Sequence, residues 1–159
     1  MGCEFGQRRE WSESRELDWP SLDHPPHQGV KDLAADLNRL YTTSPALYYH
    51  EFDYRGFEWI DCHDSSQSVL SYLRKGPAGE HLLVVLNFTP VPREGYVIGV
   101  PEAGNYVEVL NSDASWYGGG NLGNAGKVTA IRQQEHGFEY SLKLTLPPLA
   151  GLFLQKESE

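Results

Sequence analysis

One part of the chain, from Gln28 to Thr43, has apolar residues at helical spacing. The apolar positions are Val30, Leu33, Ala34, Leu37, Leu40 and Tyr41, which fall on one stripe of a helix. The other side carries Lys31, Asp32, Asp36 and Arg39. Pro45 disfavours the α conformation at Ser44 and should end the helix there. The apolar stripe needs a surface to lie on, supplied by this chain or by another part of a larger protein.

From about Phe57 onward the apolar period changes from 3.6 to 2. The segment Phe138–Leu146 alternates apolar and polar residues, as a half-buried strand does, and His81–Phe88 is an apolar run short enough for a strand buried on both faces. Further strands are expected at Phe57–Asp61, Val69–Arg74, Tyr96–Val100, Tyr106–Leu110, Val128–Gln133 and Leu149–Gln155. Short strands separated by turn residues predict an antiparallel sandwich or barrel. A helix that precedes strands, without alternation, argues against a parallel βαβ sheet.

Two segments are predicted to be long loops. Met1–His27 contains three prolines and is expected to be extended. A loop of this length indicates a functional segment or a missing partner, and we favour the partner because Phe5, Trp11 and Trp19 have no local core in the sequence pattern. The second loop, Asn111–Gly126, is rich in glycine and has two aromatic residues at its centre.

Composition and charge narrow the class of protein. The 159 residues are 40% hydrophobic and 22% charged, which is typical of one globular domain. The net charge of −9 repels phosphate backbones and anionic lipid, so neither nucleic acid nor a membrane is an expected partner. Cys3 and Cys62 form no disulfide framework, and no leader-like segment begins the chain, so a cytoplasmic protein is expected. The 4 Trp and 9 Tyr indicate either a large core or stacking surfaces for sugar rings.

Several motifs occur in an order that identifies a family. They are M-G-x-E-F-G-Q, R-E-W, L-D-W, H-x-G-V-x-x-L-x-x-D-L-N, P-A-L-Y, G-F-E-W-I-D, S-V-L-S, N-F-T-P-V-P-R, Y-x-I-G-V-P, L-N-S-D, Y-G-G and S-L-x-L-T-L-P-P-L. The chain resembles the C-terminal portion of glycogen branching enzymes, a branch of the α-amylase superfamily, from Met1 to about Leu154.

The resemblance implies an architecture. Residues 1–45 would be the end of a (β/α)₈ catalytic barrel: the end of its last strand, a loop and the closing helix. Residues 46–159 would form an all-β C-terminal domain. The expected fold is therefore mainly β, with a short barrel remnant followed by an antiparallel β-sandwich of the α-amylase type.

The resemblance also implies that the catalytic carboxylates lie upstream of Met1. Cleavage of an α-1,4 bond with retention needs two carboxyl groups about 5–5.5 Å apart, and none of the family's pair maps onto this chain. We therefore expect the isolated chain to be inactive, with no catalytic residue of its own and no cofactor. Glu4 lies where a barrel strand would end, and a supporting role there is favoured over catalysis.

Metal binding is not expected. Asp23, His24 and His27 lie close together in the sequence, as do Cys62, His63 and Asp64. Neither set has the repeated ligand spacing of a zinc site.

Sugar binding is the site hypothesis that remains, at two places. Glu4, Gln7, Trp11 and Trp19, with Arg9 nearby, would line the acceptor side of the parent enzyme's cleft if the first loop sits as the family implies. Trp116 and Tyr117, with Asn111, Asp113 and Asn121, would form a separate surface site. The alternative for Trp116 is a buried side chain that closes the end of the β-domain, which is the commoner arrangement in sandwiches.

The sequence thus predicts a non-catalytic C-terminal part of a branching enzyme. It would brace the upstream catalytic barrel and contact α-glucan through the parent. Two alternatives stay open: a stand-alone carbohydrate-binding module, and a non-enzymatic interaction domain.

Overall fold

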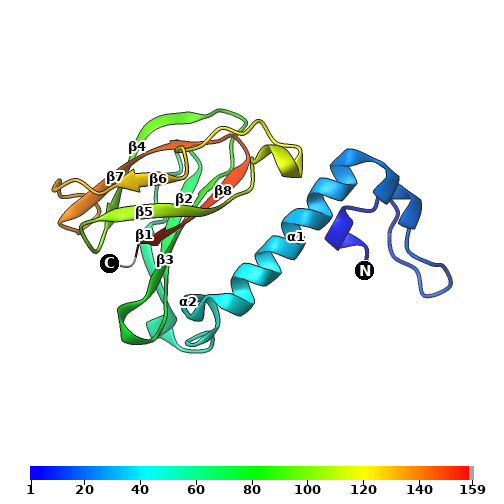
Figure 1. Cartoon of the computed structure of the whole chain (residues 1–159), viewed down its shortest axis with the longest axis horizontal. Coiled ribbons are helices and arrows are strands. Elements are labelled where there is room, and N and C mark those ends of the chain that lie inside the picture. Colours follow the sequence, from blue (N-terminus) through cyan, green and yellow to red (C-terminus); the bar gives the residue numbers. More distant parts are fainter. Residues whose placement is uncertain (158–159) are drawn as a thin grey trace.

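Eight antiparallel strands form a sandwich in the computed structural model, which describes residues 1–157 (Figure 1). The strands are β1 (Phe57–Asp61), β2 (Val69–Lys75), β3 (His81–Asn87), β4 (Arg93–Val100), β5 (Asn105–Asn111), β6 (Lys127–Thr129), β7 (Tyr140–Leu146) and β8 (Ala150–Lys156). Six of them make one sheet, in the order β1-β2-β3-β8-β5-β6, and β4 pairs with β7 in a second sheet. The predicted antiparallel sandwich is confirmed.

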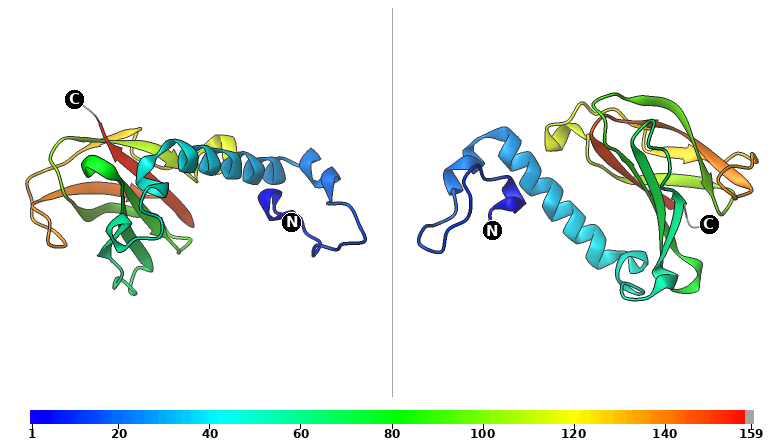
Figure 2. Two further views of the ribbon diagram at one scale, coloured as in Figure 1. Left: turned by 90° about the horizontal axis from the view of Figure 1, so that it is seen from below. Right: turned by 180° about the vertical axis from the view of Figure 1, so that it is seen from behind.

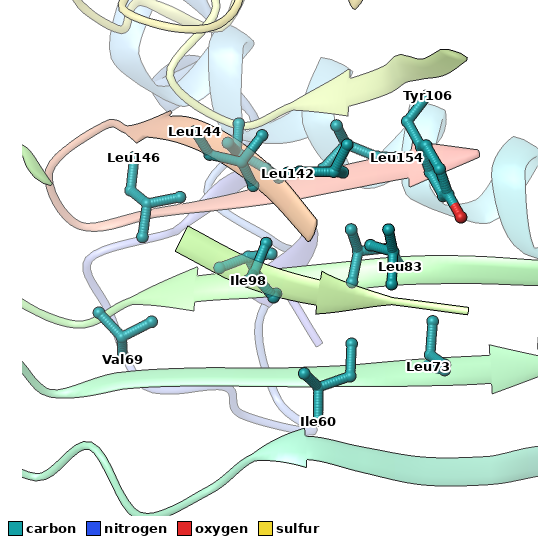
Figure 3. Close-up of a cluster of buried hydrophobic side chains, with 13 residues drawn as sticks. Ile60, Val69, Leu73, Leu83, Ile98, Tyr106, Leu142, Leu144, Leu146 and Leu154 are labelled. Atoms are coloured by element: carbon teal, nitrogen blue, oxygen red, sulfur yellow. The ribbon is translucent and has the colours of Figure 1, made fainter. Parts of the chain in front are cut away.

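The core of the sandwich lies between the two sheets (Figure 3). On β7 the apolar side chains Leu142, Leu144 and Leu146 are fully buried, and the residues between them point outward or to the edge. They pack against Leu83 of β3 and Ile98 of β4 in one cluster. The alternating pattern in the sequence therefore marks the inward face of β7.

Strand β3 is buried on both faces, as its continuous apolar run predicts. Leu83 and Val85 belong to the core between the sheets. Leu82 and Val84 point the other way and pack with Ala46 in a second cluster, to which the end of the long helix also contributes. A strand covered by a sheet on one side and by helices on the other has no solvent face, so it carries no polar alternation.

The long helix α1 spans Pro25–Thr43, and a short helix α2 follows at Pro45–Tyr48. The predicted end is confirmed: Ser44 is extended, with φ −102° and ψ 107°. The predicted start at Gln28 is wrong by one turn, because Pro25 and Pro26 occupy the first turn. Proline is tolerated there since the first N–H groups of a helix have no intrahelical acceptor.

The N-terminal segment lies beyond the start of α1, away from the sandwich, in all three views (Figures 1 and 2). It contains two 3₁₀ turns, Cys3–Phe5 and Trp19–Asp23. Phe5 is only 3% exposed and stacks on Trp19, with ring centroids 5.7 Å apart. The prediction of a structureless loop without a local core is therefore wrong for Phe5, whereas Trp11 and Trp19 are more than half exposed.

The structure contains three further 3₁₀ turns, and some strand ends differ from the predicted ones. The turns are η3 (Tyr54–Gly56), η4 (Pro77–Gly79) and η5 (Ser115–Tyr117). Strand β4 begins at Arg93, three residues before the predicted start, and its register with β7 shifts between Arg93 and Tyr96, as at a bulge. At the sheet edge β6 is shorter than predicted, and Ile131 keeps only an isolated bridge to Ser141. None of the helices in residues 1–157 is long and apolar enough to cross a membrane.

Candidate functional site

One row of α1, which includes Gly29 and Asp36, lies against the η5 turn of the sandwich. We call it the clamped row. A Cβ atom on Gly29 would lie 2.1 Å from the carbonyl oxygen of Tyr117, so only glycine allows this approach. Two turns along, the Tyr117 hydroxyl donates to the carboxylate of Asp36. Burial and this hydrogen bond raise the pKa of Tyr117. The helical pattern places Asp36 on the solvent side, and this is wrong: its carboxylate faces the η5 turn.

A second row of α1 is exposed. Val30, Leu37 and Tyr41 are 42%, 36% and 39% exposed. Val30 and Leu37 follow the clamped Gly29 and Asp36 by one residue, so they are turned about 100° around the helix axis from them. Tyr41 follows Leu40 in the same way, and Leu40 packs on the cluster beneath the helices. The second row is therefore partly open to solvent, although the Tyr41 hydroxyl donates to Glu51 and its ring meets Tyr48 edge-on. We call Val30, Leu37 and Tyr41 the open row.

The predicted site residues of the first segment are only partly brought together. Gln7 and Arg9 line a hollow of about 380 Å³. The amide group of Gln7 is already engaged, because its Nε2 donates to the Arg9 carbonyl and its Oε1 accepts from the Asp18 N–H. Trp11 and Trp19 are not among the residues that line this hollow.

Glu4 is an exposed carboxylate in the first 3₁₀ turn. A hydrogen bond from its own backbone N–H lowers its pKa. An ionised, exposed carboxylate of this kind suits a supporting role better than that of a proton donor. The role of Glu4 stays a prediction.

At the other predicted place, Trp116 is 67% exposed, so it is not a buried plug of the β-domain. Its ring meets Tyr117 edge-on, with centroids 5.7 Å apart and planes at 70°. Both line a hollow of about 380 Å³ between α1 and β5. The structure therefore brings Trp116 and Tyr117 together. It also places Asp36 and Arg39 of α1 beside them, which the sequence did not predict.

The polar residues predicted beside Trp116 hold the loop itself. Asp113 accepts from the backbone N–H groups of Gly120 and Leu122 at 2.9 and 3.0 Å. Asn121 accepts from the Ser115 N–H, and Asn111 donates to the Leu122 carbonyl at 2.7 Å. These side chains fix the loop that presents Trp116.

An aromatic cluster that was not predicted from the sequence lies on the outer face of β1 and β2, formed by Phe57, Trp59 and Tyr72. The ring centroids are 4.8 to 5.9 Å apart. Phe57 is 38% and Trp59 49% exposed. Trp59 lies directly across from Tyr72 in the strand register, so the cluster follows from pairing between strands. Its local signal is the pair of aromatics two apart in F-E-W, which places both on one face.

Metal ligation finds no support in the part of the chain that the structure describes, where no three His, Cys, Asp or Glu side chains are arranged to hold an ion. Asp64, for example, accepts hydrogen bonds from Ser66, Gln67 and Tyr96. Cys3 and Cys62 are free thiols.

Residues 59–157 match the family model of the alpha-amylase C-terminal all-beta domain. The chain belongs to this family. The family's all-beta domain thus corresponds to the sandwich from Trp59 in β1 onward.

Nearly the whole chain is also similar to curated branching enzymes. It is 55% identical to the 1,4-alpha-glucan branching enzyme GlgB of Dechloromonas aromatica over 99% of this chain and 25% of that enzyme. It is 56% identical to GlgB of Nitrosococcus oceani over 98% of this chain and 21% of that enzyme. The chain therefore spans about a fifth to a quarter of the length of these relatives, and it matches their C-terminal part.

Solved structures share the fold at low identity. The catalytic module of the glycogen-degrading pneumococcal virulence factor SpuA superposes with a TM-score of 0.58 at 16% identity, covering 91% of this chain and 20% of that one. The trehalulose synthase MutB of Pseudomonas mesoacidophila gives 0.54 at 19% identity, covering 89% and 20%. Both superpose on about nine tenths of this chain, so the fold recurs in proteins of low sequence identity.

Proposed function

We propose that this chain is the C-terminal part of a 1,4-α-glucan branching enzyme. The similarity to such enzymes over almost every residue supports this, because it includes residues 1–45 as well as the all-β domain. We call residues 1–45, which include α1, the arm. In the proposal residues 1–45 complete the catalytic barrel, and residues 46–159 form a domain that braces it. The parent enzyme would cleave α-1,4 links and form α-1,6 branches in glycogen.

The observation that carries the proposal is the open row on α1. Apolar side chains exposed along a helix favour contact with a further surface, and the other row of the same helix is already used within this chain. A helix with two packed rows lies between two bodies. We propose that the second body is the upstream catalytic barrel.

The chemistry would belong to that upstream part. Retaining cleavage requires two carboxyl groups about 5–5.5 Å apart, and the one candidate of the arm, Glu4, is an exposed carboxylate with a lowered pKa. The proposal needs no cofactor. It places the enzyme in the cytoplasm, where free thiols such as Cys3 and Cys62 stay reduced.

A chimaera tests this proposal. The matched quarter of the Dechloromonas aromatica enzyme is replaced by this chain, and branching is followed as the loss of the iodine colour of amylose. We expect the chimaera to branch amylose and the isolated 159-residue chain to leave the iodine spectrum unchanged. Branching by the isolated chain, or a folded but inactive chimaera, would contradict the proposal.

The aromatic cluster favours a second function, direct binding of α-glucan. Pyranose rings have apolar faces that stack on exposed indole and phenyl rings, and Trp59 offers half of its surface. This would make the domain a carbohydrate-binding module within the parent.

Electrophoresis of the isolated chain in gels with and without glycogen tests the binding. Glycogen should retard the unmodified chain, and Trp59→Ala should remove most of the retardation. Phe52→Ala is the matched control, because Phe52 is a fully exposed aromatic residue outside the cluster. Equal retardation of the two variants would exclude the aromatic cluster as the binding surface.

A further inference from the structure

The hollow between α1 and β5 has one apolar wall and one polar wall. Val109 and Trp116 are exposed on the sandwich side, and Asp36 and Arg39 stand on the helix side. The two sides are tied to each other by the hydrogen bond from Tyr117 to Asp36. The hollow is therefore a fixed feature of the way the arm meets the sandwich.

Trp116 contributes little to the packing of the fold. Two thirds of its surface is exposed, whereas the neighbouring Tyr117 anchors the helix. An indole ring has a broad apolar face and one N–H donor. Its loop is held by the side chains of Asp113 and Asn121, so the ring is presented without a large entropy cost on binding.

The polar wall suits a neutral ligand. Asp36 and Arg39 form an ion pair, and the Arg39 side chain is 72% exposed, so N–H donors of its guanidinium remain accessible. A charged ligand would have to compete with one member of the pair. Neighbouring hydroxyl groups of a sugar can instead donate to the carboxylate and accept from the guanidinium at the same time.

We propose that this hollow is a second α-glucan site, in which a glucose ring stacks on Trp116 and its hydroxyl groups bond Asp36 and Arg39. The choice of α-glucan rests on the proposed function, and the site is distinct from the aromatic cluster on β1 and β2. A chain held here lies against the helix that carries the open row. Binding at this site would thus require α1 and the sandwich to be in their observed contact, because both line the hollow.

The four tryptophans make a site-resolved test possible. The indole N–H resonances of the full chain are assigned from single Trp→Ala variants and followed during titration with maltoheptaose. We expect a saturable shift of the Trp116 resonance. Arg39→Ala should weaken the affinity measured at Trp116 by about tenfold, because a charge-assisted hydrogen bond is lost.

Arg132→Ala is the matched control, since Arg132 is also an exposed arginine in an ion pair, with Glu139. It should leave the affinity at Trp116 unchanged. A shift at Trp59 with none at Trp116 would overturn the second site and leave the proposed function standing. No shift at either residue would overturn the second site and the glucan binding proposed for the aromatic cluster. Equal affinities of Arg39→Ala and Arg132→Ala would overturn the polar wall of the site.

Discussion

Gly29 shows how a single residue sets the position of the arm. Helix interiors favour alanine over glycine by about 1 kcal/mol, so propensity alone would favour Gly29→Ala. The Cβ atom of that alanine would lie 2.1 Å from a backbone oxygen of Tyr117, which cannot move as a side chain can. Steric exclusion therefore decides, and glycine is required by the close approach of the loop.

We expect Gly29→Ala to lower the free energy of unfolding by about 1–3 kcal/mol, the usual cost of overpacking. Urea denaturation followed by circular dichroism measures it. Asn38→Ala is the control, because Asn38 is exposed on the same helix and should gain a few tenths of a kcal/mol from propensity. A Gly29→Ala protein as stable as Asn38→Ala would mean that α1 does not lie against the η5 turn.

Asp64 is a partly exposed carboxylate whose pKa departs from its ordinary value. Burial by itself would raise its pKa, but hydrogen bonds from Ser66, Tyr96 and Gln67 outweigh burial and lower it. A carboxyl group whose pKa is lower in the folded state stabilises the fold above the unfolded pKa of about 3.9. That contribution is lost as the pH falls through the folded pKa.

The free energy of unfolding should therefore begin to fall as the pH drops toward the unfolded pKa of about 3.9, and continue to fall until the pH has passed below the folded pKa. Tyr96→Phe removes one donor, so the pKa of Asp64 moves back toward its ordinary value and part of this fall disappears. Denaturation curves at several pH values compare it with Tyr54→Phe, a control at an exposed tyrosine. An unchanged pH dependence in Tyr96→Phe would show that the hydrogen bond from Tyr96 does not lower the pKa of Asp64.

Strand β3 is the element that joins the two packed regions. Leu83 lies in the core between the sheets, and Leu82 lies in the cluster beneath the helices. Both are fully buried. Adjacent residues of one strand thus stabilise different interfaces.

Leu82→Ala and Leu83→Ala should each cost about 2–5 kcal/mol of unfolding free energy. Only Leu82→Ala should also speed hydrogen exchange in α2 and in the end of α1, because its cavity opens beneath them. Exchange measured by mass spectrometry separates the two. Faster exchange of the helices in both variants alike would indicate one cooperative unit instead of two packed regions.

Features set by neighbours in sequence could be predicted, and features set by distant contacts could not. Pro45 ends α1 through its own ring, and the alternation from Phe138 to Leu146 marks β7 whatever packs on it. The place of Asp36 against Tyr117 joins residues 81 positions apart, which no local pattern specifies. For the candidate site, the sequence indicated a loop with Trp116 and Tyr117 at its centre but favoured a buried Trp116, which the structure leaves 67% exposed. The polar wall on the helix was not predicted.

At the scale of the whole molecule, α1 connects the N-terminal segment to a sandwich that has a hydrophobic core between its sheets (Figure 1). The clamped row and the helix end at Leu40 join α1 to the sandwich. The open row is partly exposed to solvent, and within it Tyr41 donates a hydrogen bond to Glu51 of this chain. The open row is therefore the surface that, in our proposal, packs against the upstream catalytic barrel.

The most direct test places the same charge at two neighbouring positions of α1 in the chimaeric branching enzyme. Leu37→Asp puts a carboxylate in the open row, and Asn38→Asp puts one on the solvent side of the same turn. We predict that Leu37→Asp loses most of the branching activity and lowers the melting temperature, because a buried unpaired charge is costly, while Asn38→Asp keeps both. Equal activity and stability of the two variants would contradict the claim that the open row braces the barrel.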